Sequence, residues 1–343
     1  MKNLTATPLP RRTVLIAGAS AALASPWLQA QTSPQATPAL ASSKVVKLIV
    51  GFPAGQATDI VARLLAERMR AVTGDNYVVE NRPGTGGSLA LGVLAKAPAD
   101  GSVMMLAHMS AVATNPHIYQ SVPYDSAKDF EPVGLVGDLP FVLVVNADLP
   151  VKNLAELIAY ARANPEKLTN ASSGNGTVSH LAMEEIKRKA GLKITHIPYK
   201  GSVAGLTDVV SGNVSMALET ASAVRPHIES GRLRALAVGS TKRLGGVLAN
   251  VPTLAESNIA GLGNFNAVTW LMLLYPAGTP KATGRATFNA LKSVMSLPET
   301  EQKLTATGLQ TRTSTSPEEA AAYLKSELIN WGDVVKRSGI PKE

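Results

Sequence analysis

The feature that most constrains the fold of this chain is an alternation, from Val45 onward, of short apolar runs with segments whose apolar residues recur at helical spacing. The run 45–51 (VVKLIVG) has the length of a buried strand, and residues 59–72 place apolar side chains on one face of a helix. A short strand over 77–80, a helix over 88–96 and a strand over 103–107 are predicted next. This order predicts an α/β fold with a mostly parallel sheet flanked by helices.

The same alternation continues through the rest of the chain. Residues 132–146 contain two predicted strands, and the segment that follows predicts helices over 154–164, 178–190, 204–211 and 223–229 and strands over 169–171, 195–198, 216–218 and 233–238. The chain then returns near 264–274, before predicted helices near 280–296, 298–306 and 316–337. We therefore expect one lobe from residues 44–142 and 264–343, a second from 143–263, and closure of the two over a cleft.

Composition excludes several classes of protein. The 343 residues include no cysteine, which rules out a disulfide framework, a thiolate zinc site and a cysteine nucleophile. The formal net charge is +8, but Lys and Arg are scattered among acidic residues and aromatic residues make up only 4%. This pattern favours an ordinary solvated surface over a nucleic-acid interface.

The first 30 residues have the composition of an export signal. Arg11 and Arg12 precede the apolar stretch Thr13–Leu28, and the small residue Ala30 follows. The paired arginines favour the twin-arginine route, and the general secretory route stays open. We expect cleavage after Ala30, a disordered leader over 31–43, and a mature protein that is free in the periplasm.

Three glycine-rich segments each lie between a predicted strand and a predicted helix. They are residues 52–59 (FPAGQATD), 81–88 (NRPGTGGS) and 172–177 (SSGNGT). Glycine allows the backbone to approach a ligand closely, and the start of the following helix offers unpaired N–H groups and partial positive charge. Because ligands of open α/β sheets bind beyond the carboxyl ends of the strands, the three segments predict an anion site. We expect Thr58, Ser88 and Thr177 to be the helix N-caps.

Other chemistries are poorly supported by the residues. No segment matches the phosphate loop GxxxxGK[ST] or the dinucleotide pattern GxGxxG with a later acid. Ser172, Ser173 and His180 lack a GxSxG elbow and an evident third member, so hydrolysis is not favoured. His108, His117 and His227 share no metal-binding spacing. We expect no enzyme activity, no cofactor and no metal.

Longer stretches resemble the receptors of tripartite tricarboxylate transporters, the TctC-like or Bug family of periplasmic binding proteins. The resemblance spans about 45–340 and is carried by IVGFPAG and ATD (49–59), ENRPGTGG (80–87), PADG (98–101), VPYD and KDFEPVG (122–134), ELIAYARANPEKL (156–168), SSGNGTVSHLA (172–182), HIPYKGSVAGLTDVVSG (196–212), RPHIESGRLRALAV (225–238), VPTLAES (251–257) and YPAGTP (275–280).

The resemblance implies a two-lobed Venus-flytrap fold of the periplasmic-binding-protein type II. It also implies that a monomer binds a small carboxylate largely through backbone N–H groups and passes it to membrane permease subunits driven by an ion gradient. The ligand-binding residues that the loops and the resemblance indicate are Phe52, Ala54, Gly55, Gln56, Thr58, Asp59, Gly84, Thr85, Gly86, Gly87, Ser88, Ser172, Gly174, Thr177, His180, Tyr199, Lys200, Gly201, Asp208 and Glu219.

Several roles stay open at this level. His180 either contacts the ligand or supports the third loop, and Asp59 and Ser88 either bind ligand or tie down their loops. By the resemblance, Asp208 is expected at a helix start facing the cleft, where it binds an amino group or caps the helix. A mono-, di- or tricarboxylate, an aromatic acid and an amino acid all remain candidate ligands. An extracytoplasmic sensing subunit for a two-component kinase is the alternative to transport.

Two residues depart from the family pattern. Gln56 stands where the family usually has glycine, and Glu219 stands where it usually has Asp or Asn. Gln56 adds two hydrogen-bonding groups at the cleft wall, and Glu219 is expected near the distal end of the ligand. We expect the two to shift ligand choice toward a solute with a polar or amino distal group.

Overall fold

The computed structural model describes residues 44–263, 265–340 and 342. The predicted export signal over 1–30 and the predicted leader over 31–43 lie outside the described residues. Within the described part of the chain, no helix combines the length and the apolar character that crossing a membrane requires.

The first lobe begins with three parallel strands in the order β2-β1-β3. They are β1 (Val45–Val50), β2 (Asn76–Asn81) and β3 (Val103–His108), connected by helices α1 (Ala57–Thr73) and α2 (Ser88–Ala95). The central strand β1 alternates exposed and buried residues at its start and is buried from Leu48 onward, as expected for a strand covered on both faces. The predicted strand–helix order is confirmed here.

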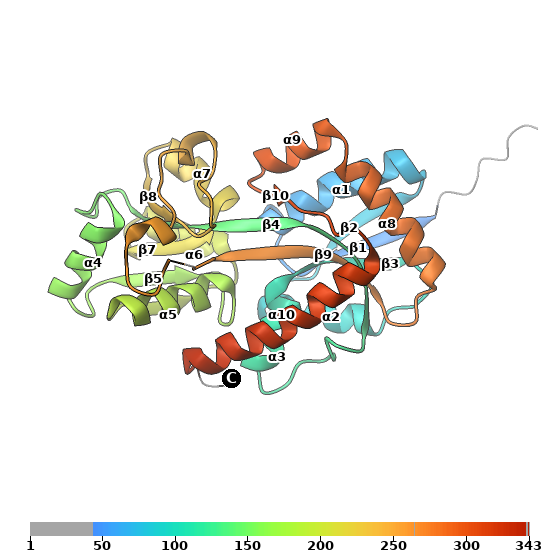
Figure 1. The fold of residues 1–343 in the computed structure, drawn as a ribbon, viewed down its shortest axis with the longest axis horizontal. Coiled ribbons are helices and arrows are strands. Elements are labelled where there is room, and N and C mark those ends of the chain that lie inside the picture. The colour runs from blue at the N-terminus through green and yellow to red at the C-terminus, as the bar shows by residue number, and fades with distance from the viewer. Residues whose placement is uncertain (1–43, 264, 341, 343) are drawn as a thin grey trace, which may run out of the picture. The chain divides into compact units, whose positions relative to one another are not determined.

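Two long strands connect the lobes: β4 (Phe130–Asn146) and β9 (Val268–Pro276), which pair antiparallel (Figure 1). β4 pairs with β9 over 130–140 and then, over 141–146, with strands of the second lobe. The prediction of two strands within 132–146 is wrong. Two register shifts, near Gly134 and Gly137, let one strand bend and change partners without ending.

The second lobe continues the sheet from β4 in the order β4-β7-β5-β6, and β8 also pairs with β4. Its strands are β5 (Thr169–Ser172), β6 (Thr195–Pro198), β7 (Met216–Thr220) and β8 (Leu233–Val238). Its helices are α4 (Leu154–Ala163), α5 (Val178–Ala190), α6 (Ser202–Val210) and α7 (Ala221–Glu229). β5 pairs parallel with β6 and β7, so every antiparallel pair among the described strands involves β4 or β9. The predicted α/β fold class is confirmed.

The C-terminal part packs mainly on the first lobe. It comprises α8 (Lys281–Met295), α9 (Pro298–Ala306), the short strand β10 (Gln310–Thr311), which pairs with β4, and α10 (Pro317–Ser338). Helix α10 contacts β4 and also α5 of the second lobe. Short helical segments complete the described chain: η1 (Thr85–Gly87), η2 (Ser110–Thr114), α3 (Asn115–Ile118), η3 (Gly246–Leu248) and η4 (Ala255–Ser257).

Apolar burial explains why this arrangement is stable. One hydrophobic cluster fills the space between the first-lobe strands and α1, α8 and α9, and includes Leu65, Leu106 and Leu291, all 0% exposed. Another cluster extends along β4 and β9 into the second lobe. Burial of each large aliphatic side chain contributes roughly 1.5–3 kcal/mol. The long strands therefore carry a core that is continuous across both lobes.

The helix starts differ in part from the prediction. Helix α1 begins at Ala57 with Gln56 at the N-cap position, and α2 begins at Ser88 after Gly87, so the predicted caps Thr58 and Ser88 are wrong. The glycine-rich turn η1 leads directly into α2, which moves the cap one residue earlier. Thr177 does occupy the N-cap position of α5, and its hydroxyl donates to the Gly174 carbonyl at 2.6 Å.

Candidate functional site

The first glycine-rich loop is fixed by a buried carboxylate. Asp59 is 2% exposed and accepts hydrogen bonds from the Gly55 N–H at 2.8 Å, Arg63 Nε at 3.0 Å and Asn81 Nδ2 at 2.9 Å. Burial alone raises the Asp59 pKa, but the hydrogen bonds from Arg63, Gly55 and Asn81 outweigh burial and lower it. Asp59 thus braces the loop that precedes α1.

The second loop combines positive φ angles with polar bracing. Gly84, Gly86 and Gly87 have φ angles of 144°, 56° and 95°, which favour glycine. A Cβ on Gly51, just before the first loop, would lie 2.9 Å from the Gly87 Cα, so the chain at the two loops meets backbone to backbone.

Two side chains beyond the second loop hold it in place. Asn115 Nδ2 donates to the Thr85 carbonyl at 3.0 Å and to Ser88 Oγ at 2.8 Å. The Ser88 hydroxyl also bonds the Tyr124 hydroxyl at 3.0 Å. Ser88 therefore ties down its loop rather than facing the cleft.

Two stacked histidines support the third loop. The rings of His180 and His196 lie 3.9 Å apart at 8°. His180 Nδ1 accepts the Gly176 N–H at 3.2 Å, and His196 Nε2 bonds Ser172 Oγ at 2.6 Å. Burial, with a smaller effect of nearby charges, lowers the pKa of each ring to about 4. Both rings are therefore neutral near neutral pH and act as hydrogen-bonding supports.

These histidines and Glu184 form a cluster whose ligand atoms lie within 4.8 Å of one another. Its geometry does not suit a metal ion. The in-plane lone pairs of parallel stacked rings do not converge, and Nδ1 of His180 already accepts a backbone N–H, so its Nε2 carries the proton in the neutral ring. The Glu184 carboxylate forms an ion pair with Lys187 Nζ at 2.5 Å. We interpret the cluster as structural.

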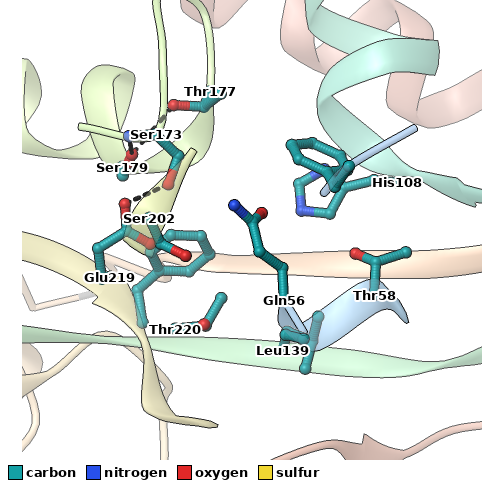
Figure 2. A pocket seen from close by; sticks show the side chains of 13 residues that line it. Gln56, Thr58, His108, Leu139, Ser173, Thr177, Ser179, Ser202, Glu219 and Thr220 are labelled. Carbon is teal, nitrogen blue, oxygen red and sulfur yellow. Dashed lines mark hydrogen bonds between the residues drawn. The ribbon is translucent and has the colours of Figure 1, made fainter. Parts of the chain in front are cut away.

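Two neighbouring cavities lie at these loops, and the first and third loops line both of them. The outer one, here called the vestibule, has a volume of about 600 Å³ and is lined by residues of all three loops together with neighbouring residues. The lining consists of Gly51, Phe52, Pro53, Pro83, Gly84, Thr85, Gly86, Gly87, Tyr119, Ser173, Gly174, Asn175, Pro198, Tyr199, Lys200 and Gly201. The inner cavity has about 30 Å³ and is lined by Phe52, Gln56, Ala57, Thr58, His108, Leu139, Phe141, Ser173, Thr177, Ser179, Ser202, Glu219 and Thr220 (Figure 2). The inner cavity has room for one or two water molecules.

Gln56 lies where the two cavities meet. Its side chain points between Glu219 and His108 in Figure 2 and is 9% exposed. A Cβ on Gly201 would overlap Gln56 Nε2, so this first-lobe side chain touches the second-lobe backbone. No hydrogen bond to another described residue holds the Gln56 amide. Because Gln56 lines the inner cavity, a bound solute or a water molecule can be the partner of its amide.

Glu219 contributes a buried carboxyl group to the inner cavity. It is 3% exposed, and the Ser173 hydroxyl donates to its Oε1. Burial raises the Glu219 pKa to about 7, and hydrogen bonds from Ser173, Thr220 and Ser179 only partly offset that effect. Within the described lining of the inner cavity there is no lysine or arginine to neutralise Glu219.

His108 is a cavity residue that sequence reasoning missed. It ends β3, and its Nδ1 accepts the Ser110 N–H at 3.1 Å. Burial lowers the pKa of His108 to about 3, so the ring is neutral and its proton lies on Nε2. His108 thus offers a neutral donor to the cavity that it lines. Its place at the carboxyl end of a strand was the available signal.

The predicted site residues fall into three groups. Those that line the inner cavity are Phe52, Gln56, Thr58, Thr177 and Glu219. Those that line the vestibule are Phe52, Gly84, Thr85, Gly86, Gly87, Gly174, Tyr199, Lys200 and Gly201. Those that line neither are Ala54, Gly55, Asp59, Ser88, Ser172, His180 and Asp208. Besides His108, sequence reasoning missed Ser179 and Ser202, at the starts of α5 and α6.

Asp208 requires a correction. It was expected at a helix start facing the cleft, but α6 spans Ser202–Val210, so Asp208 lies in its last turn. There it accepts the Tyr199 hydroxyl at 2.5 Å. Burial and this carboxylate raise the Tyr199 pKa to about 12. Asp208 therefore orients a tyrosine of the vestibule rather than facing the cleft itself.

The structure has two α/β lobes joined by the long strands β4 and β9, and helix starts and glycine-rich loops of both lobes surround one cleft. This arrangement defines a solute-binding protein of the Venus-flytrap type. The model of the tripartite tricarboxylate transporter family receptor matches residues 61–340. The chain belongs to this family, whose members are periplasmic solute-binding receptors rather than enzymes. The resemblance stated from the sequence is thereby confirmed.

Relatives and solved structures agree with this assignment. The protein BugT of Bordetella pertussis is 34% identical over 298 residues, which cover 87% of this chain and 90% of BugT. The structure of R. palustris Rpa4515 with adipate is similar with a TM-score of 0.83 and 33% identity, and covers 88% of this chain and 99% of that one. MatC from Rhodopseudomonas palustris with bound malate has a TM-score of 0.76 and 28% identity, and covers 85% and 99%.

Proposed function

We propose that this protein captures a small carboxylate between its lobes for a tripartite tricarboxylate-type secondary transporter. The observation that carries the proposal is the convergence of all three glycine-rich loops on one vestibule, next to the starts of α1, α5 and α6. Because α1 begins at Ala57, the N–H groups of Ala57 and Thr58 have no carbonyl acceptor within the helix. They can bind a carboxylate without a cationic side chain.

The solved relatives support a carboxylate, since one structure holds adipate and another holds malate. In this proposal the receptor acts as a monomer in the periplasm and delivers its solute to membrane permease subunits. Residues 1–30 direct its export, and N-terminal sequencing of the exported protein checks cleavage after Ala30. The proposal includes the predicted division of the chain into one lobe from residues 44–142 and 264–343 and a second lobe from residues 143–263.

The test compares small carboxylates with their neutral amides. A thermal-shift screen finds acids that raise the melting temperature, and calorimetry then measures each acid beside its amide. We expect at least tenfold weaker binding of the amide, because aligned N–H dipoles favour a negative charge. Equal affinity of acid and amide, or no binding by any acid, contradicts the proposal.

A further inference from the structure

The donors around Glu219 belong to the helix starts that a ligand anion in the second lobe would use. Ser179 lies in the first turn of α5, Thr220 is the N-cap of α7, and Ser173 lies in the third loop. The two hydroxyl groups and the N–H groups of Ser173 and Thr220 all stabilise the charged Glu219 carboxyl group. These donors of the third loop, α5 and α7 are thus directed at the protein's own side chain, and Ser202 at the start of α6 is not among them.

The first-lobe side of the inner cavity has the opposite character. It presents the start of α1, the unpartnered amide of Gln56 and the Nε2–H group of neutral His108. Asp59, the acidic residue of this region, faces Gly55, Arg63 and Asn81 instead. Donors therefore line the first-lobe side of the cavity, and the other side adds a carboxyl group that no lysine or arginine of the described lining neutralises.

We infer that the solute carries one carboxylate and, at its far end, a cationic hydrogen-bond donor of the ammonium type that pairs with Glu219. This inference rests on the proposed function and specifies its substrate class. The ammonium group would supply the countercharge that the buried Glu219 lacks. A second carboxylate at that end would place a second negative charge beside Glu219, with no lysine or arginine in the described lining to offset it, so Glu219 selects against dicarboxylates.

The other titratable groups near Glu219 do not replace it in this role. His108 of β3 faces the same cavity and is neutral. On α5, His180 is neutral and Glu184 pairs with Lys187. Asp208 of α6 bonds Tyr199, and Asp59 of α1 bonds Arg63. A change in selectivity between pH 6 and pH 8 would therefore report on Glu219.

The experiment uses pairs of ligands with matched chain length. The ω-amino acids from 4-aminobutanoate to 6-aminohexanoate are compared by calorimetry with succinate, glutarate and adipate, and with the plain monocarboxylates butanoate to hexanoate. At pH 8 we expect the native protein to bind at least one amino acid ten times more tightly than the diacid and the monocarboxylate of equal length. At pH 6 the disadvantage of the diacid should shrink, because protonation of Glu219 removes a negative charge.

The variant Glu219→Gln keeps the size of the side chain and removes its charge. We expect it to lose at least tenfold in affinity for the amino acid, to gain affinity for the diacid, and to lose the difference between pH 6 and pH 8. Glu166→Gln, an exposed second-lobe carboxylate paired only loosely with Lys193 at 3.9 Å, is the matched control and should behave as the native protein does.

The outcomes separate the two proposals. The inference is overturned if the native protein at pH 8 binds a diacid or a plain monocarboxylate as tightly as the amino acid of equal chain length. The proposed function as a carboxylate receptor is unaffected by that result. An unchanged preference in a folded Glu219→Gln variant also overturns it. Because the comparison of ligand pairs needs only the native protein, the inference is tested even if the variant does not fold. Absence of binding by every carboxylate overturns the proposed function itself.

Discussion

At the scale of single residues, the site depends on a few side chains whose environment departs from the ordinary. Gln56 and Glu219 could be singled out from the sequence, because each interrupts a recognisable family stretch. Asn115 could not be, since nothing in its sequence neighbourhood shows that it braces a loop 30 residues away. For His108 the available signal was its position at the end of a strand. Such contacts arise only when distant strand ends meet at one edge of the sheet.

Glu219 also makes stability depend on pH in a defined direction. Its pKa in the folded protein is about 7, against 4.5 as the ordinary value. Because the folded pKa is raised, its contribution to stability is fully present below about pH 4.5 and is lost progressively as the pH rises to about 7. We expect the native protein to lose on the order of 3 kcal/mol relative to Glu219→Gln across this window, from 1.36 kcal/mol per pKa unit.

Denaturant unfolding of the ligand-free proteins at pH 5 and pH 8 measures this difference. The Glu166→Gln control should follow the native protein at both values. Parallel curves for native protein and Glu219→Gln would show that the carboxyl group of Glu219 titrates as it does in the unfolded chain.

At the scale of elements, the sequence predicted nearly every helix and strand but misjudged β4. The sequence suggests a break between two strands at Asp138, Leu139 and Pro140, because proline cannot donate a backbone hydrogen bond to a sheet. In the structure Pro140 is the last β4 residue paired with β9, and Phe141 is the first paired with β7. The spacing of apolar residues does not show which strand each residue pairs with. It therefore could not reveal that one strand pairs first with β9 and then with β7.

Helix α10 is anchored to β9 through one carboxylate. Glu327 Oε2 accepts Trp270 Nε1 at 2.7 Å and Trp331 Nε1 at 3.1 Å. Trp270 is 1% exposed, so Glu327→Ala would leave a buried indole N–H without its acceptor. We expect that variant to lose about 1–3 kcal/mol of stability.

Thermal and denaturant unfolding measure this loss. Glu327→Gln, which keeps an acceptor oxygen, should lose clearly less, and Lys325→Ala on the exposed side of the same helix should stay within about 0.5 kcal/mol of the native protein. A Glu327→Ala variant as stable as the Lys325→Ala variant would show that the indole finds another partner.

At the scale of the whole molecule, the lobes meet too closely for a solute to reach the inner cavity. Its volume of about 30 Å³ is smaller than any of the carboxylates discussed above, and Gln56 touches Gly201 between the cavities. Opening of the lobes must therefore precede entry of the solute. The two-lobed class was predictable from the sequence, whereas this degree of closure depends on contacts between side chains of both lobes.

Binding kinetics should show the opening step directly. Because the chain has no cysteine, a dye attached to Lys200→Cys labels a single exposed position at the vestibule. In stopped-flow experiments we expect the observed rate to level off at high ligand concentration, where opening limits the rate. Calorimetry on the unlabelled protein checks that the label leaves affinity unchanged. A rate that rises linearly with ligand concentration would mean that the cleft is already open in solution.

The shared carboxylate of Glu327 has a practical consequence for spectroscopy. Of the three tryptophans in the sequence, the two within the described residues both donate to this one oxygen, and both line a cavity that contains residues of α5 and α10. Both indoles therefore report on the surroundings of one carboxylate group. The fluorescence of these two tryptophans is thus a local optical probe of the region where the lobes are joined.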